Sequence, residues 1–246
     1  MRVFRCPLQR QARLSVTRAL LDKDLILLRG APLSGKSIVL SVLFSSMNDP
    51  KCLWPIVIRS PHVHVGKSLR LAFAHALGLP SSVVCSSPRA LNSVLHELNS
   101  KDAAVVLAID DIDIFFLGAA KVYQDACDFI FYLSKRLSRL KIVGTFSRFE
   151  KIRSIAKDLR MENHCVLELQ CWPATTEFCD FVKYVGKNFG LSEHQVSDKA
   201  FLQALFESTR GATGAILTTI KILVMSGVFE GGEVASPVHL GQLWRF

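Results

Sequence analysis

The residues with the most definite chemistry form a glycine-containing loop near the start of the chain. They are Gly30, Ala31, Pro32, Leu33, Ser34, Gly35, Lys36 and Ser37. Their spacing matches G-x-x-x-x-G-K-[ST], a loop whose backbone N–H groups surround phosphate oxygens while the lysine reaches the β- and γ-phosphates and the hydroxyl ligates Mg²⁺. We therefore predict that these residues bind ATP, that Lys36 also takes part in catalysis, and that Ser37 also binds Mg²⁺.

The sequence on both sides of this loop predicts the elements that a phosphate loop requires. Asp24–Arg29 is an apolar run typical of a short buried strand, and Ser37–Phe44 is typical of a helix. The two glycines permit a tight backbone path, and the helix that starts at Lys36 directs its positive N-terminal end toward a phosphate. This context favours a nucleotide site over the alternative, a glycine-rich turn with an incidental lysine.

Two adjacent carboxylates follow a second buried strand. Ala103–Ile109 is an unbroken apolar run, typical of the centre of a parallel sheet, and Asp110 and Asp111 come directly after it. Ligands of open α/β sheets bind at the carboxyl ends of the strands. We predict that Asp110 holds Mg²⁺ through its waters and that Asp111 orients the water that attacks ATP. The alternative is that the two acids only cap the next turn.

A hydroxyl residue ends another expected strand, Ile142–Thr145. At the carboxyl edge of a nucleotide-binding sheet, this hydroxyl can contact the γ-phosphate or the attacking water. We therefore predict that Thr145 is a catalytic sensor, with Ser147 as the second choice. A hydroxyl at a strand end is also common in proteins that bind no nucleotide, so this alternative stays open.

The remaining pattern predicts an α/β core followed by helices alone. Further strands are expected over 54–59 and 165–169, and helices over 9–21, 66–79, 87–98, 121–140, 149–161, 175–189, 197–208 and 214–225. Ser192 and Ser197 suit helix N-caps. We expect a basic lead-in over 1–23, a core with a five-stranded parallel sheet over 24–171, and a helical lid with a C-terminal tail over 172–246.

The net charge of +9 permits a polyanionic partner such as nucleic acid, with a solvated basic face as the alternative. Two basic clusters carry most of this argument. The first contains Arg2, Arg5, Arg10, Arg13 and Arg18. The second contains Lys135, Arg136, Arg139, Lys141, Arg148, Lys151, Arg153, Lys157 and Arg160.

The composition also bears on the compartment. The seven cysteines are dispersed, with no C-x-x-C pair, which is typical of thiols in a reducing compartment and favours the cytoplasm. No run of about 18 uncharged apolar residues occurs, so we expect no membrane partner. The arginine-rich, acid-free start has no apolar segment typical of a secretory signal, but it also resembles an organelle transit peptide, which remains a minor alternative.

Taken together, these motifs resemble AAA+ ATPases, and in particular the transposon ATP-binding proteins of the TniB and TnsC type, which are related to the phage Mu ATPase MuB. The resemblance covers about residues 20 to 230. It rests on Gly30–Ser37, Val105–Asp111, Ile142–Thr145, Ile155–Arg160, Leu169–Trp172 and Ser208–Gly214. The two nucleotide motifs are general to ATPases, and the C-terminal segments point to this family.

The resemblance implies a Mg²⁺-dependent ATPase that assembles as a ring or filament on double-stranded DNA and recruits or activates a transposase. It implies that Arg160 is an arginine finger acting on the ATP of a neighbouring copy, with Arg153 as its rival. It also implies a nucleotide contact from Arg210, although family patterns place that arginine a little further into the last helix, where this chain has Ala212 and Thr213. Many relatives have Glu in place of Asp111, and the shorter side chain is expected to slow hydrolysis.

Two other functions remain open from the sequence. One is an initiator-like AAA+ ATPase that loads another protein on DNA. The other is a nucleotide-dependent signalling switch with no role on DNA. Salt-sensitive duplex binding that requires ATP distinguishes the transposition function from the switch, and stimulation of a transposase distinguishes it from the loader.

Overall fold

The computed structural model describes residues 6–45, 53–59, 68–80, 88–100, 103–116, 119–147 and 152–226. These residues group into two compact units. One unit contains the chain up to Arg10, the loop Gly30–Gly35 and the chain from Leu169 onward, and the other contains Gln11–Arg29 and Lys36–Glu168. The phosphate loop thus groups with the C-terminal helices, a division that differs from the expected 24–171 and 172–246. Each unit is described by itself below.

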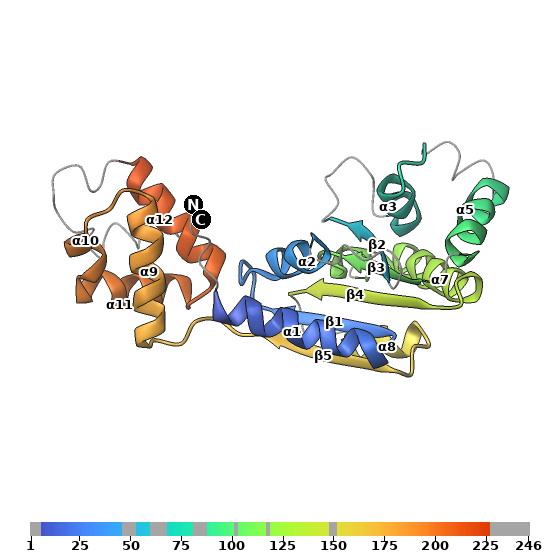
Figure 1. Cartoon of the computed structure of the whole chain (residues 1–246), viewed down its shortest axis with the longest axis horizontal. Coiled ribbons are helices and arrows are strands. Elements are labelled where there is room, and N and C mark those ends of the chain that lie inside the picture. The colour runs from blue at the N-terminus through green and yellow to red at the C-terminus, as the bar shows by residue number, and fades with distance from the viewer. Residues whose placement is uncertain are drawn as a thin grey trace. The chain divides into compact units, whose positions relative to one another are not determined.

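The larger unit is built on a five-stranded parallel sheet, as predicted. Its strands are β1 (Leu25–Gly30), β2 (Leu53–Ile58), β3 (Ala104–Ile109), β4 (Leu140–Phe146) and β5 (His164–Leu169). Their order across the sheet is β2-β3-β4-β1-β5 (Figure 1). The first strand therefore lies between β4 and β5, and the carboxyl ends of β3 and β4 are neighbours.

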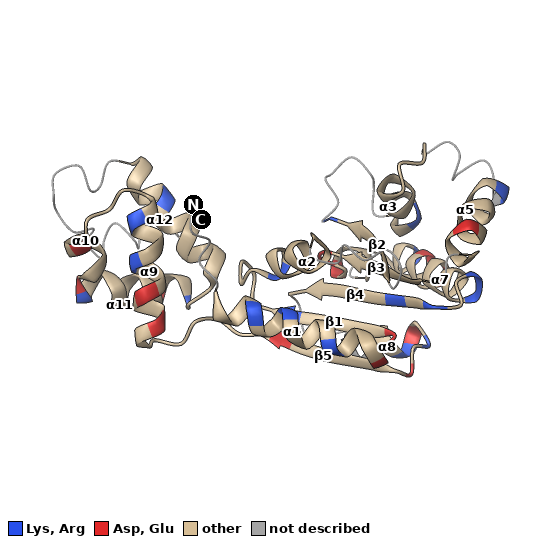
Figure 2. Cartoon of the chain, in the orientation of Figure 1, with Lys and Arg blue, Asp and Glu red and all other residues tan. Residues whose placement is uncertain are grey.

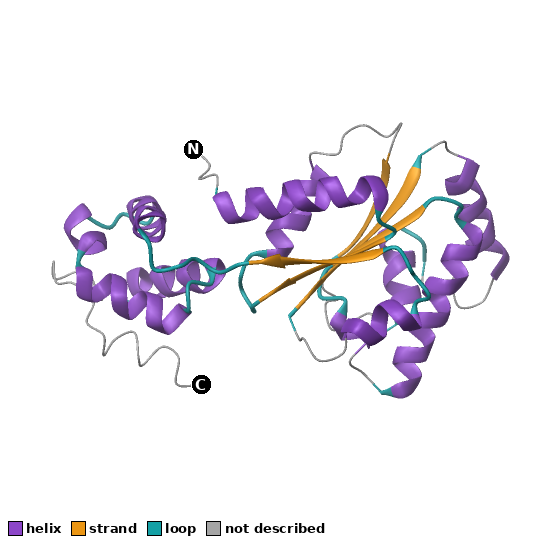
Figure 3. Cartoon of the chain, turned by 90° about the horizontal axis from the view of Figure 1, so that it is seen from below, coloured by secondary structure: helices purple, strands orange, loops and turns teal. Residues whose placement is uncertain are grey.

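Helices cover both faces of this sheet (Figure 3). Successive residues of β3 enter opposite cores, because side chains alternate along a strand: Val105 and Leu107 enter one core, and Val106 and Ala108 enter the other. The second core also contains residues of α1 (Pro7–Asp22) and α2 (Lys36–Ser45). The first contains residues of α3 (Leu69–Ala76), α5 (Pro88–Ser100), α6 (Asp113–Phe116), α7 (Ala120–Arg136) and α8 (Ile152–Asp158).

The smaller unit has a helical core of its own. Its helices are α9 (Thr176–Asn188), α10 (Glu193–Ser197), α11 (Lys199–Thr209) and α12 (Thr213–Met225). Trp172 stacks on Phe181 with ring centroids 4.9 Å apart, and both rings belong to the same buried cluster as Phe201 and Ile216. The apolar residues of these helices thus form a buried cluster of their own. In the part of the chain that the structure describes, no helix is both long and apolar enough to cross a membrane.

Two of the differences between predicted and observed helix boundaries have a clear structural reason. Ser192 caps α10 as expected, but Ser197 is the last residue of that helix, and the side chain of Asp198 caps α11 by accepting a hydrogen bond from the N–H of Phe201 at 2.7 Å. Helix α7 ends at Arg136 and not at residue 140, because Leu140 pairs with Val105 in the sheet. Tertiary pairing overrides helical periodicity there.

The turn before α12 provides a test of backbone strain. Gly211 has φ +69°, and a Cβ at this position would lie 2.1 Å from the carbonyl oxygen of Trp172. We expect Gly211→Ala to lower the free energy of unfolding by about 2 kcal/mol or more, because left-handed strain adds to a backbone clash. Gly190→Ala is the matched control, since Gly190 has φ +85° with no atom within 4 Å of the added Cβ. Equal losses for both variants in urea unfolding would contradict the clash.

Candidate nucleotide site

The phosphate loop connects β1 to α2 and has an unusual backbone. Leu33 has φ +60° and Gly35 has φ +102°, so left-handed residues occur twice within the motif. Such a backbone turns successive N–H groups toward a common centre, which is how proteins bind anions with main-chain donors. A left-handed leucine is uncommon and indicates that surrounding contacts hold the loop in this conformation. The geometry fits the predicted phosphate-binding function.

Ser37 and Asp110 line one cavity, as their predicted roles in Mg²⁺ binding require. Ser37 follows Lys36 in the first turn of α2, and Asp110 follows β3. They share a cavity of about 540 Å³ with Arg59, which follows β2, and with apolar residues of α2 and β2. Hydroxyl, carboxylate and phosphate oxygens are ligands that Mg²⁺ prefers. The residues present therefore fit a Mg²⁺–phosphate group, and the metal site itself stays a prediction.

Thr145 fixes the turn that carries the two carboxylates. Its side chain is fully buried, donates a hydrogen bond to Asp110 Oδ1 at 2.6 Å and accepts one from the N–H of Asp111 at 2.8 Å. Its carbonyl oxygen accepts a hydrogen bond from the N–H of Ile112 at 2.8 Å, and Asp111 has φ +50°. One threonine thus orients the carboxylate of Asp110 and fixes the backbone of Asp111 at the carboxyl end of β3.

This geometry changes how Thr145 would act as a sensor. A hydroxyl has a single proton to donate, and here that proton is donated to Asp110. A hydrogen bond from Thr145 to a γ-phosphate would therefore require the bond to Asp110 to break. The sensor role remains a prediction, with the added expectation that Thr145 acts through the carboxylates. The second choice, Ser147, directs its backbone N–H to Asp113 Oδ2 at 3.2 Å.

Arg160 lies at the opposite end of the same sheet. Its guanidinium is 5.2 Å from the ring centroid of Phe131, beside a groove that includes Leu140 and Lys141, the first residues of β4. Thr145 lies five residues after Leu140 along β4, which corresponds to roughly 16 Å at 3.3 Å per residue. Arg160 is therefore far from the carboxylates of its own chain, and a catalytic role for it would require a neighbouring copy. The side chain of Arg153, the other candidate for the arginine finger, is outside the described residues.

Arg210 does not contact the phosphate loop in the described structure. It is an exposed left-handed residue with φ +50° at the end of α11, and Ala212 occupies the N-cap of α12. The hydrogen bonds from this unit's helices to the loop come from the side chain of Gln9 and the backbone N–H of Gly214, and Thr213 is bonded to Gln9. The nucleotide contact of Arg210 stays a prediction.

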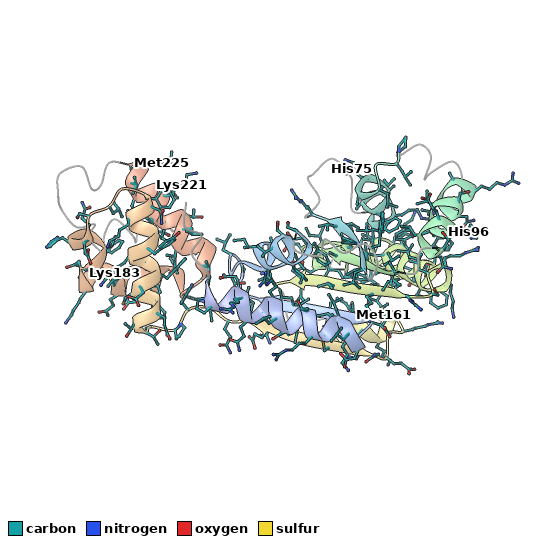
Figure 4. The ribbon with its side chains drawn as sticks, in the orientation of Figure 1. His75, His96, Met161, Lys183, Lys221 and Met225 are labelled. Atoms are coloured by element: carbon teal, nitrogen blue, oxygen red, sulfur yellow. The ribbon has the colours of Figure 1, made fainter. Side chains whose placement is uncertain are left out.

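The groove beside Arg160 is a second feature of the larger unit. It has a volume of about 780 Å³ and is formed where β1, β3, β4 and β5 begin. Its charged residues are Lys135, Arg139, Lys141 and Arg160, together with Asp24 and Glu162. Figure 2 shows basic residues gathered where β4 begins, and Met161, labelled in Figure 4, also lines the groove. Cations therefore outnumber carboxylates two to one in this groove.

Comparison with known proteins identifies the fold. No family model matches the chain, and no curated protein matches it. A Walker-type ATPase of Pyrococcus abyssi superposes with a TM-score of 0.62 at 14% identity, covering 96% of this chain and 74% of that chain. Cdc6p of Pyrobaculum aerophilum superposes with a TM-score of 0.62 at 15% identity, covering 93% of this chain and 64% of that chain.

The chain has the fold of an AAA+ ATPase. The Hsp104–ADP complex of Saccharomyces cerevisiae is a more distant match, with a TM-score of 0.53 at 15% identity, covering 89% of this chain and 30% of that chain. This chain thus spans less than two thirds of the Cdc6p chain and about a third of the Hsp104 chain. The similarity extends to the general AAA+ fold and does not single out the transposon family.

Sequence reasoning missed three residues near the site. Gln9 and Thr213 contact each other at 3.0 Å although 204 residues separate them, so no local pattern could pair them. Arg59 lines the cavity of Ser37 and Asp110. Its position directly after an expected strand was a usable signal, because the strands of a parallel sheet end at one edge.

Proposed function

We propose that the chain is an ATP-dependent, DNA-binding AAA+ regulator of DNA transposition, which oligomerises on duplex DNA and recruits or activates a transposase. The observation that supports its ATPase activity most directly is the turn after β3 that carries Asp110 and Asp111. Asp110 shares a cavity with Ser37, and Thr145 holds Asp110 and Asp111 in fixed positions. A carboxylate held beside the predicted Mg²⁺–phosphate site, with a second acid next to it on a fixed backbone, fits a hydrolase better than a passive nucleotide binder.

Each residue has a separate task in the proposed reaction. The loop N–H groups and Lys36 bind and orient the phosphates, and Ser37 and Asp110 hold Mg²⁺, which neutralises charge on the phosphate oxygens. Asp111 orients the attacking water and accepts its hydrogen bond. Thr145 holds the Asp110 carboxylate and the backbone of Asp111, so that Asp110 would be placed to hold the metal and Asp111 to orient the water.

The basic groove supports a DNA partner. A protein that binds duplex without sequence preference needs Lys and Arg side chains directed at phosphates. Lys135 Nζ lies 5.3 Å from the centroid of Phe131, and Arg160 lies at 5.2 Å from the same ring, which is 38% exposed. Two cations held on one exposed ring are partly ordered before any phosphate arrives.

We also propose that the chain assembles with itself and that Arg160 acts on a neighbour's ATP. Its separation from Asp110 and Thr145 within one chain supports this, because only a second copy can bring an Arg160 to the nucleotide. A guanidinium supplied in trans stabilises the charge that develops during phosphoryl transfer. ATP bound between copies would then favour the assembled ring or filament.

The first experiment is duplex DNA binding with ATP, with ADP and without nucleotide, at low and moderate salt, viewed by negative-stain electron microscopy. Rings or filaments that form on DNA only with ATP are the expected result. ATP binding without assembly on DNA would overturn the DNA function and favour the signalling switch. Assembly on DNA without stimulation of any transposase would favour the initiator-like loader, an alternative that is also compatible with the fold similarity to Cdc6p.

Lys135→Ala tests whether the groove is the DNA contact. We expect several-fold weaker duplex binding and a salt slope reduced by about 0.9, the amount for one lost phosphate contact. Arg136→Ala is the matched control, because Arg136 is adjacent on α7 but lies over Tyr132, outside the groove. Equal effects of the two variants on affinity and slope would contradict a specific role for the groove.

A further inference from the structure

A polar cluster joins the phosphate loop to the helical part of its own compact unit. The side-chain amide of Gln9 in α1 donates to the carbonyl oxygen of Ser34 at 3.2 Å and to the hydroxyl of Thr213 at 3.0 Å. The indole N–H of Trp172 donates to the same hydroxyl at 3.1 Å. Thr213, the first residue of α12, is thus bonded both to the helical core and, through Gln9, to the loop.

The backbone of α12 contacts the loop directly. The N–H of Gly214 donates to the carbonyl oxygen of Leu33 at 2.6 Å, and Leu33 is the residue with φ +60°. A Cβ on Gly214 would lie 2.8 Å from that oxygen, and a Cβ on Gly35 would lie 2.7 Å from the amide nitrogen of Gln9. Gly214 is needed for this close approach because its neighbour is backbone, whereas the Gln9 side chain could move away from a Cβ at Gly35, and the bond from Gly214 is made to a left-handed residue of the loop.

These hydrogen bonds are largely buried, so losing one would cost more free energy than losing an exposed hydrogen bond. Thr213 is 4% exposed, Ser34 1% and Trp172 3%. Removing the Thr213 hydroxyl would leave the donors of Gln9 and Trp172 without this acceptor in a largely buried setting. An unsatisfied buried donor costs more than a hydrogen bond contributes when formed, so the loop would be expected to rearrange.

We propose that Gln9 and Thr213 are positioning residues that hold the phosphate loop in its phosphate-binding conformation, so that the helical unit sets the affinity for nucleotide. The proposal rests on the nucleotide-binding part of the proposed function. The helical part of this unit would then influence nucleotide binding without an arginine. Its described hydrogen bonds to the loop involve Gln9, Thr213 and the loop backbone, whereas Arg210 is exposed. By reciprocity, nucleotide that orders the loop also strengthens its attachment to α12.

The test compares two substitutions of Thr213 with one at Thr219. Thr213→Val keeps the shape and removes the acceptor, and Thr213→Ser keeps the acceptor. Thr219→Val is the matched control, because Thr219 lies on the same helix, is fully buried, and its hydroxyl has no hydrogen-bond partner in the described structure. Affinity for a fluorescent ATP analogue and amide hydrogen exchange of residues 33–35 without nucleotide are measured for each.

We expect Thr213→Val to weaken nucleotide affinity about tenfold and to speed exchange in the loop, with Thr213→Ser within about twofold of the wild type. Thr219→Val should match the wild type in both measurements. Gln9→Met should weaken affinity similarly, and combining it with Thr213→Val should cost less than the product of the two effects, because they share one hydrogen bond.

Three outcomes would overturn the proposal: wild-type affinity and loop exchange in a folded Thr213→Val, an equal loss in Thr219→Val, or full multiplicative effects in the double variant. Failure of the proposed function is a separate result. If the wild type binds no ATP, the nucleotide function is wrong, but loop exchange in the nucleotide-free protein still shows whether Gln9 and Thr213 hold the loop.

Discussion

Replacing Lys36 with alanine should abolish ATP binding while leaving the protein folded. Lys36 is the first residue of α2 and is only 5% exposed, so its side chain is almost entirely shielded from bulk water. Its positive charge adds to that of the helix N-terminus, where the phosphates are expected to bind. Losing a charge-assisted contact to the β- and γ-phosphates should reduce affinity by at least about 100-fold, which titration calorimetry would measure.

The control for this variant must share its local structure. Lys199 is the exposed first residue of α11, so Lys199→Ala makes the same change at the start of another helix. Alanine is a good helix former, and both variants should retain the helical circular dichroism of the wild type. Unchanged ATP affinity in a folded Lys36→Ala protein would overturn the assignment of Gly30–Ser37 as a phosphate loop.

The parts of the fold with local sequence signals were predictable. The glycine loop, the apolar run of β3 with its two aspartates, and the hydroxyl of Thr145 each occupy the structural position that their patterns indicate. A motif of this kind is defined by neighbours in the chain, so periodicity and spacing suffice to place it. The structure adds that Thr145 bonds to Asp110 and Asp111, a contact that follows from β3 and β4 being paired in the sheet.

What the sequence could not provide are contacts set by tertiary packing. The pairing of Gln9 with Thr213 joins two residues of one compact unit that lie 204 positions apart in the chain, so no local pattern predicts it. The end of α7 depends on the sheet, and the cap of α11 depends on a choice between adjacent Ser197 and Asp198 that propensity alone does not settle. The location of Arg160 at the amino ends of the strands likewise follows from sheet order.

Asp111→Asn should keep ATP binding and reduce turnover by about 100-fold or more. The backbone of Asp111 is left-handed, with φ +50°, and asparagine tolerates this conformation well, so the hydrogen bond from its N–H to Thr145 should persist. Asp110 keeps its own bond to Thr145, and the predicted metal ligand is undisturbed. The amide has the shape of the carboxylate but lacks the charge that orients and activates water.

Asp113→Asn is the matched control for this loss. Asp113 is two residues further on, and its carboxylate accepts a hydrogen bond from the N–H of Ser147, which an asparagine oxygen can replace. Steady-state phosphate release should then stay within about threefold of the wild type in Asp113→Asn and fall sharply in Asp111→Asn, with equal ATP affinity in both. Wild-type turnover in Asp111→Asn would mean that another group orients the water, and Asp110 would be the next carboxylate to test, because it lies on the same Thr145-anchored turn.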